Sequence, residues 1–246
     1  MNNTVPSRPL IGIGLGGLCE GWLPPVLHLY QTKVMRFSRI LLIDGKTFTE
    51  RNRERQHFNG LRPKAEERCA LWQSIYPDAP LDYCVAFVDA TNVSRFIGDG
   101  AIVLLSPDNH ATRKVVSDHV QTLHTTLLIC GCNDGINAER GEDGTEGCVI
   151  VHCKVQGKDL TPPITRHHPE IAEPEDRLPN DLGCTELAAG EPQLVATNLM
   201  VGHTMALLLH RYCAFPIEEA AQLPEVWVNS RTGAVVRYGI KERSMA

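Results

Sequence analysis

Short apolar runs alternate with amphipathic stretches along the first half of the chain. The apolar runs predict buried strands at residues 10–14, 39–44, 82–88, 101–105 and 125–130. The stretches between them predict helices at residues 17–31, at residues 64–76 and from about His110. Pro24 and Pro25 predict a late start or a kink in the first helix. Strands that alternate with helices predict an α/β fold with a doubly wound, mostly parallel sheet and helices on both faces.

The pattern changes after Gly131. Residues 133–147 are rich in glycine and acids and predict a mobile loop, and proline-rich residues 159–183 predict extended or partly disordered chain. Three further elements are predicted: a strand at residues 147–155, a long helix at residues 193–213 and a terminal hairpin at residues 225–238. We expect one domain over residues 1–246, with halves at residues 1–131 and 132–246.

Composition narrows the class of protein. The chain has 246 residues, 43% of them hydrophobic, and a formal net charge of −5, so it can bury a full core and offers no basic stripe for nucleic acid. No apolar run approaches the roughly 18 residues that cross a bilayer, and residues 1–9 lack the apolar core of a signal peptide. We therefore expect a cytoplasmic protein. Nine cysteines without any Cys-x-x-Cys pair favour buried thiols over a disulfide framework or a zinc site.

A glycine-rich loop follows the first predicted strand. Gly14, Gly16 and Gly17 leave a strand ahead and a helix start behind, so we prefer them to the register of Gly12, Gly14 and Gly17. Glycines let a backbone approach phosphate, and the helix start supplies unpaired N–H donors. Asp44 ends the second strand, where an acid typically accepts ribose hydroxyls; a turn or helix cap is the alternative. The two features predict a nucleotide site.

The next segment carries groups that suit charged oxygens and have no evident use in a nicotinamide site. Arg55 offers a rigid fork of donors, and Asn52 and Gln56 can orient it. Lys64 adds a positive charge at the start of the following helix. A solvated loop and a surface lysine are the alternative interpretations.

Asp108 and Asn109 follow the fourth predicted strand. Their oxygens suit Mg²⁺, and they equally suit the cap of the helix that follows. Because the carboxyl ends of parallel strands meet at one edge of a sheet, we expect the glycine loop, Asp44 and Asp108 to converge in one crevice.

Together these motifs resemble the ubiquitin-activating-enzyme-like adenylyltransferase family of the ThiF/MoeB/HesA type. The resemblance covers residues 9–131 and consists of the glycine loop, L-x-D, N-x-x-R-Q, G-x-x-x-K and D-N followed by Arg113. It implies a Rossmann-like fold, an ATP site that includes the loop glycines and Asn109, and catalytic roles for Arg55, Lys64 and Asp108. The individual roles that it implies are ribose binding by Asp44, phosphate binding by Asn52, Arg55, Gln56 and Lys64, and Mg²⁺ binding by Asp108.

The resemblance also implies an activity, the adenylation by ATP of the C-terminal carboxylate of a ubiquitin-like or sulfur-carrier protein. Cys184, ahead of the long helix, would then form a thioester; Cys153 is the rival, and a structural cysteine is the alternative. The segment from Cys184 to Asn198 further resembles ThiF-type proteins of bacterial PRTRC systems, which also encode a conjugating-enzyme-like partner. A homodimer is expected, with the helix around residues 196–209 as one candidate contact.

Departures from the family pattern keep other functions open. Lys46 stands where many relatives carry a second acid, and Cys19 where a third loop glycine is usual. Relatives often supply an N-terminal arginine from the partner subunit, and only Arg8 precedes the first strand here. The alternatives are adenylation of a non-protein or peptide carboxylate, and a nucleotide-binding scaffold without turnover. A nicotinamide-dependent oxidoreductase would leave Arg55 and Lys64 unexplained.

Overall fold

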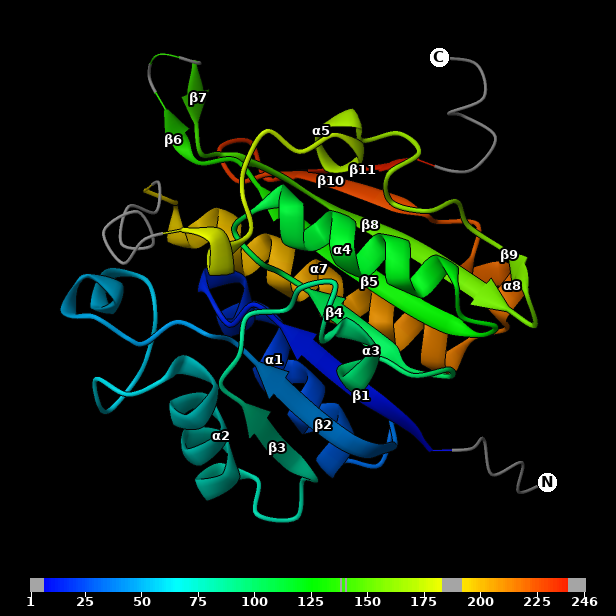
Figure 1. The fold of residues 1–246 in the computed structure, drawn as a ribbon, viewed down its shortest axis with the longest axis horizontal. Coiled ribbons are helices and arrows are strands. Elements are labelled where there is room, and N and C mark those ends of the chain that lie inside the picture. Colours follow the sequence, from blue (N-terminus) through cyan, green and yellow to red (C-terminus); the bar gives the residue numbers. More distant parts are fainter. Residues whose placement is uncertain (1–6, 138, 140, 183–191, 239–246) are drawn as a thin grey trace.

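A computed structural model describes residues 7–137, 139, 141–182 and 192–238 of the protein. Within these residues a nine-stranded sheet runs in the order β11-β10-β8-β5-β4-β1-β2-β3, with β9 paired to β8 (Figure 1). The first five strands pair in parallel, as the alternation of strands and helices predicts. They are β1 (Arg8–Ile13), β2 (Phe37–Ile43), β3 (Leu81–Cys84), β4 (Ile102–Leu105) and β5 (Thr126–Asn133).

An antiparallel extension completes the sheet beside β5. The first strand of the extension, β8, pairs with β5 from Thr126↔Lys154 to Asn133↔Gly147, and the terminal hairpin adds two strands beyond it. The extension consists of β8 (Glu146–Val155), β9 (Lys158–Asp159), β10 (Glu225–Asn229) and β11 (Ala234–Tyr238). The hairpin and the long helix that precedes it agree with the sequence prediction.

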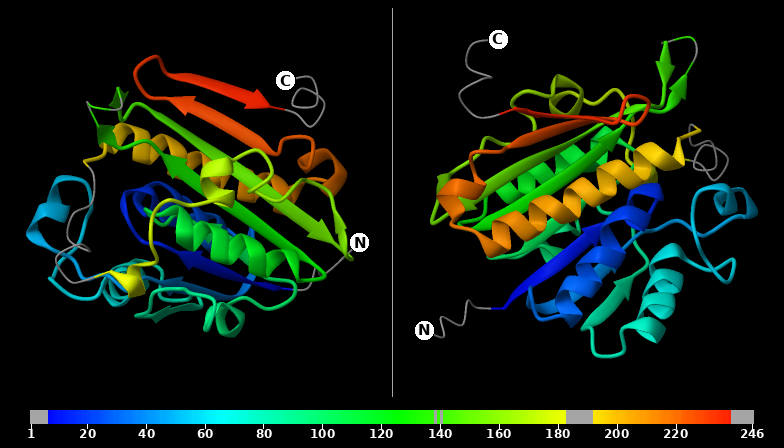
Figure 2. Two further views of the ribbon diagram at one scale, coloured as in Figure 1. Left: turned by 45° about the horizontal axis from the view of Figure 1, so that its top comes forward. Right: turned by 180° about the vertical axis from the view of Figure 1, so that it is seen from behind.

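Helices cover both faces of the sheet (Figures 1 and 2). One face carries α1 (Gly17–Gln31), α2 (Lys64–Ile75), α7 (Val195–Ala214) and α8 (Ile217–Ala220). The other carries α3 (Val93–Phe96), α4 (His110–Gln121) and α5 (Pro169–Ala172). Two 3-10 turns are η1 (Glu50–Glu54) and η2 (Pro179–Asp181). In the part of the chain that is described, no helix has the length and apolar content to cross a membrane.

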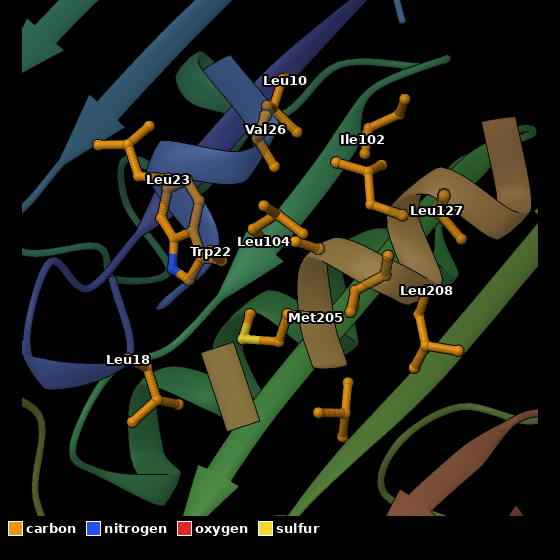
Figure 3. Close-up of a cluster of buried hydrophobic side chains, with 14 of the residues drawn as sticks. Leu10, Leu18, Trp22, Leu23, Val26, Ile102, Leu104, Leu127, Met205 and Leu208 are labelled. Atoms are coloured by element: carbon orange, nitrogen blue, oxygen red, sulfur yellow. The ribbon is translucent and has the colours of Figure 1, made fainter. Parts of the chain in front are cut away.

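The long helix α7 docks on α1 through two glycines. A Cβ at Gly202 would lie 2.3 Å from the Leu18 carbonyl oxygen and 2.7 Å from the Gly21 Cα, so no side chain fits between these helices. Trp22 and Met205 are fully buried in the apolar cluster around this contact (Figure 3). The small residue Gly202 therefore serves the protein's own core.

The structure differs from the sequence prediction in the first helix and in the segment after β5. Helix α1 starts at Gly17 and runs through Pro24 and Pro25, so it has the predicted bounds, and of the two outcomes predicted from the prolines the late start does not occur. The buried residues Trp22 and Val26 flank the prolines, so packing against the core offsets the lost backbone hydrogen bonds. Residues 133–147, predicted to be a mobile loop, include a short hairpin of β6 (Ile136–Asn137) and β7 (Glu142–Asp143).

Candidate functional site

A pocket of about 670 Å³ opens at the carboxyl ends of the parallel strands. It lies where the chain leaves β1 and β4, the two neighbouring strands at which the order of the sheet reverses. Doubly wound sheets place ligands at this point, and the volume is typical of small-molecule sites. The predicted residues that line the pocket are Gly14, Gly16, Gly17, Asp44, Arg55, Gln56, Lys64, Asp108 and Asn109.

Three glycines shape the turn between β1 and α1. Gly14 has φ +82°, and a Cβ there would lie 2.5 Å from the Pro107 backbone nitrogen, so this position needs glycine. A Cβ at Gly17 would lie 2.1 Å from Asn198 Nδ2, on α7. Gly16 is the N-cap residue of α1 and has no side chain to bond to the first N–H groups of the helix. A Cβ at Gly16 would meet nothing within 4 Å. The start of α1 thus borders the pocket with no side chain before it, an arrangement that suits a phosphate.

Asp44 connects the glycine loop to the loop after β2. Its Oδ2 accepts the Leu15 N–H at 2.7 Å, and its Oδ1 accepts the Lys46 N–H at 2.7 Å. A carboxylate oxygen can accept more than one hydrogen bond. Asp44 can therefore hold this turn and accept ribose hydroxyls at the same time, so the two sequence interpretations are compatible.

The segment between η1 and α2 brings two cations and an amide to the pocket. Only 6% of Lys64 is exposed, and burial lowers the pKa of its ammonium below that of an ordinary lysine. Burial also lowers the pKa of Arg55. Gln56 is buried, and among the described residues its Oε1 has no hydrogen-bond partner. The two cations fit a negatively charged ligand such as the triphosphate of ATP. Buried polar groups usually have partners, so the Gln56 Oε1, which is an acceptor, suits a hydrogen-bond donor on a ligand or a water molecule.

Two asparagines act as caps. Asn52 does not belong to the pocket lining; its Oδ1 accepts the Thr49 N–H at 3.0 Å, and its carbonyl oxygen accepts the Arg55 N–H at 3.1 Å. Asn52 thereby shapes the turn that presents Arg55. Asn109 lines the pocket, and its Oδ1 caps α4 by accepting the Thr112 N–H at 2.7 Å.

Asp108 is paired with a lysine. The Lys46 Nζ donates to Asp108 Oδ2 at 2.5 Å. Enclosure by the pocket acts to raise the pKa of Asp108, but the Lys46 charge and hydrogen bond together with the Lys64 charge hold that pKa below its ordinary value. Both Asp44 oxygens already accept backbone N–H groups.

The carboxylate oxygens of Asp44 and Asp108 do not fit the predicted magnesium ion. Mg²⁺ demands near-octahedral oxygen coordination, and the Lys46 ammonium occupies the carboxylate expected to bind it. The geometry therefore gives no support to Asp108 as a metal ligand.

The second half contributes pocket residues that the motifs did not predict. Asp176 accepts the N–H groups of His110 at 2.6 Å and Ala111 at 2.7 Å, and so caps α4 from a distant segment. Asp134 also lines the pocket, and partial burial with Glu142 nearby raises the pKa of Asp134 to about 6. The acidic composition of these segments was the only available signal, since no spacing connects them to the nucleotide motifs.

Two further predicted residues lie away from the pocket, and a third cannot be placed. Cys184 lies outside the described residues. Cys153 is buried in β8, and burial raises its pKa to about 11, which disfavours a reactive thiolate. Arg8 begins β1 and donates through Nε to the Gly100 carbonyl oxygen at 2.5 Å, at the far end of the strand from the pocket.

Solved structures share this fold. A crystal structure of PaaA aligns with a TM-score of 0.62 at 12% identity. The structure of E. coli MccB with AMPCPP and MccA aligns with a TM-score of 0.64 at 10% sequence identity. The structure of the microcin C7 biosynthetic enzyme MccB with N-formylated MccA aligns with a TM-score of 0.66 at 11% identity. Each alignment covers 95% of this chain and 64% of the solved chain, so this chain spans about 64% of their length. The chain has the Rossmann-like α/β fold of these proteins. No protein-family model and no curated protein matches it.

Proposed function

We propose that this protein is an ATP-dependent adenylyltransferase that acts on the C-terminal carboxylate of a polypeptide. The observation that carries the proposal is the buried Lys64 ammonium, which shares one pocket with Arg55 and the uncapped start of α1. Three sources of positive potential at one place suit a triphosphate, whereas a hydride-transfer site has no need of them. In support, MccB, which has this fold, has been solved with ATP and with AMPCPP.

In the proposed reaction a carboxylate oxygen of the polypeptide attacks the α-phosphorus of ATP. The new O–P bond replaces the bond to the bridging oxygen, and pyrophosphate leaves with that electron pair. Negative charge gathers on the phosphate oxygens during this exchange, and Lys64 and Arg55 stabilise it in a pocket that partly excludes water. Asp44 binds the ribose, and the glycine loop lets the backbone approach the phosphates.

The family resemblance favours a ubiquitin-like or sulfur-carrier protein as the substrate. A shorter peptide is the second candidate, and the MccB structures favour it. They contain MccA, and its selenomethionine and N-formylated forms identify it as a polypeptide. A thioester on Cys184 would follow by attack of the thiolate on the acyl carbon, with AMP as leaving group. The homodimer and the conjugating-enzyme-like partner stay predictions of the sequence.

ATP–pyrophosphate exchange tests the proposal. We expect exchange in the presence of a polypeptide with a free C-terminal carboxylate, and none with the same polypeptide amidated at that end. Cys184→Ala is expected to retain exchange and to lose any reducible acyl adduct. A protein that binds ATP but exchanges pyrophosphate with no ubiquitin-like protein, sulfur carrier or peptide is a scaffold, and the proposal is then wrong.

A further inference from the structure

Both the side chain and the backbone of Lys46 make contacts that hold this residue at the pocket. Its Nζ lies 2.5 Å from Asp108 Oδ2, and its backbone N–H donates to Asp44 Oδ1 at 2.7 Å. Its carbonyl oxygen accepts the Lys64 N–H at 2.8 Å. Lys46 is therefore tied to the loop after β2, to the loop after β4 and to the start of α2, which all border the pocket.

The Lys46–Asp108 pair is open to solvent within the pocket. A quarter of the Lys46 side chain (25%) and about half of the Asp108 side chain (48%) are exposed, and both residues line the pocket. Solvent-exposed ion pairs contribute little to stability, so stability alone does not explain this contact. The pair Lys114–Asp118 on α4, with a 2.8 Å contact, is a comparable pair outside the pocket lining.

The pair also changes the charge that a ligand meets. An acid at position 46 beside Asp108 would create two neighbouring carboxylates, which would repel a polyphosphate unless a cation lay between them. With lysine there, Asp108 is neutralised by the protein itself, and the Lys46 ammonium joins the other cations of the lining, Lys64 and Arg55 among them.

We propose that Lys46 binds the phosphates of the nucleotide directly, and that its ammonium takes the place of a divalent cation on Asp108. The inference rests on the proposed function, because it needs a nucleoside triphosphate as the ligand. Asp108 acts here as a positioning residue that directs the ammonium into the pocket. Mg²⁺ and the ammonium would compete for the same Oδ2, so a pocket that uses Lys46 does not need the metal for binding.

Calorimetric titration of ATP into the full-length protein, in EDTA and in Mg²⁺, tests this inference. We expect the wild-type affinity to differ by less than about threefold between the two conditions, and Lys46→Met to bind about tenfold more weakly in EDTA, as for the loss of one charge-assisted contact. Lys46→Arg keeps the charge and is expected to keep the affinity. Lys114→Met, which removes the matched surface pair, is expected to leave both affinities unchanged.

Lys46→Asp tests the converse, because it replaces the ammonium by a second carboxylate beside Asp108. It is expected to bind ATP weakly in EDTA, to recover in Mg²⁺, and to bind Mn²⁺ without nucleotide in an electron paramagnetic resonance titration. The wild type is expected to bind no Mn²⁺ in that titration. If the wild type binds ATP only with Mg²⁺, or if Lys46→Met binds as well as the wild type in EDTA, the inference is wrong and the proposed function stands. If the wild type binds ATP in neither condition, both are wrong.

Discussion

The parallel and antiparallel halves of the sheet supply pocket residues in different ways. In the parallel half, Gly14, Asp44 and Asp108 each come within a few residues of the end of a strand. In the other half, Asp176 and Gln193 come from irregular chain and reach the pocket from outside the strands. In the parallel half, strand direction places the pocket residues, so they follow the strand ends in a regular way. In the antiparallel half, individual hydrogen bonds place them, and these follow no regular pattern in the sequence.

Contacts between the halves show how the second kind of placement works. Asn133 Nδ2 donates to Asn198 Oδ1 at 2.8 Å, joining the end of β5 to α7. Asp176 caps α4, and Asn180 Nδ2 donates to Asp89 Oδ2 at 2.5 Å near the start of α3. Each of these bonds joins residues more than 60 positions apart. The pocket is complete only when both halves have folded against each other.

The largest effect is expected for a substitution in the parallel half, and it concerns the rate of ATP–pyrophosphate exchange. Lys64→Met removes the buried cation, and we expect ATP–pyrophosphate exchange to fall about 100-fold, as when one preorganised electrostatic donor is removed. Arg51→Met is the matched control, because Arg51 is exposed and outside the pocket lining. Exchange by Lys64→Met within threefold of the control would remove Lys64 from the proposed mechanism.

The next effect concerns the contact of α7 with α1, which joins the halves. Gly202→Val would force a side chain toward the Leu18 carbonyl oxygen, where even a Cβ would lie at 2.3 Å. We expect the free energy of unfolding in urea to fall by about 3 kcal/mol, the upper end for overpacking of a core. Gly98→Ala is the control, since a Cβ at Gly98 meets nothing within 4 Å. Equal stability of the two variants would mean that the helices can separate at low cost.

A smaller effect is expected where the second half caps α4. Asp176→Ala removes the acceptor of the His110 and Ala111 N–H groups. We expect a loss of about 1 kcal/mol in the free energy of unfolding, as for other helix caps. Glu175→Ala, at the neighbouring position in the same lining, is the control. A loss shared equally by both variants would trace to the segment as a whole and not to the cap.

The smallest effect is a pH dependence from the second half. Partial burial and the nearby Glu142 raise the pKa of Asp134 to about 6, so the pocket gains a negative charge as pH rises through that value. We expect ATP affinity to fall about twofold to threefold more between pH 5 and 7.5 in the wild type than in Asp134→Asn, since like charges in solvent interact weakly. The raised pKa also means that this group's contribution to stability falls as pH rises. Parallel pH profiles for the two proteins would contradict the assignment.

Much of the parallel half could be predicted from apolar periodicity. The helix predicted at residues 17–31 matches α1 (Gly17–Gln31), and the one predicted at residues 64–76 exceeds α2 (Lys64–Ile75) by one residue. The strand predicted at residues 82–88 was too long. β3 lies at the edge of the sheet and ends at Cys84, and the next apolar residue, Val85, is 47% exposed. Apolar character alone does not show where an edge strand loses its partner.

The candidate site could be predicted to a similar extent. Residues that directly follow a strand or begin a helix, such as Asp44 and Lys64, line the pocket together. Asn52 belongs to the N-x-x-R-Q motif with Arg55, but it does not line the pocket. Its side chain accepts a hydrogen bond from the Thr49 N–H within the turn and acts as a cap. A spacing pattern does not distinguish a side chain that meets a ligand from one that holds the backbone around it.

By itself, the sequence determined the alternating α/β order, the glycine turn and the group of charged residues at the carboxyl edge of the sheet. These features depend on local periodicity and strand direction, which neighbouring residues set. Only the tertiary structure decided that Asp108 pairs with Lys46, that Asp176 caps α4 and that Gly202 faces Gly21. Each of these contacts joins distant parts of the chain, and its energy depends on a geometry that exists only after the halves have packed together.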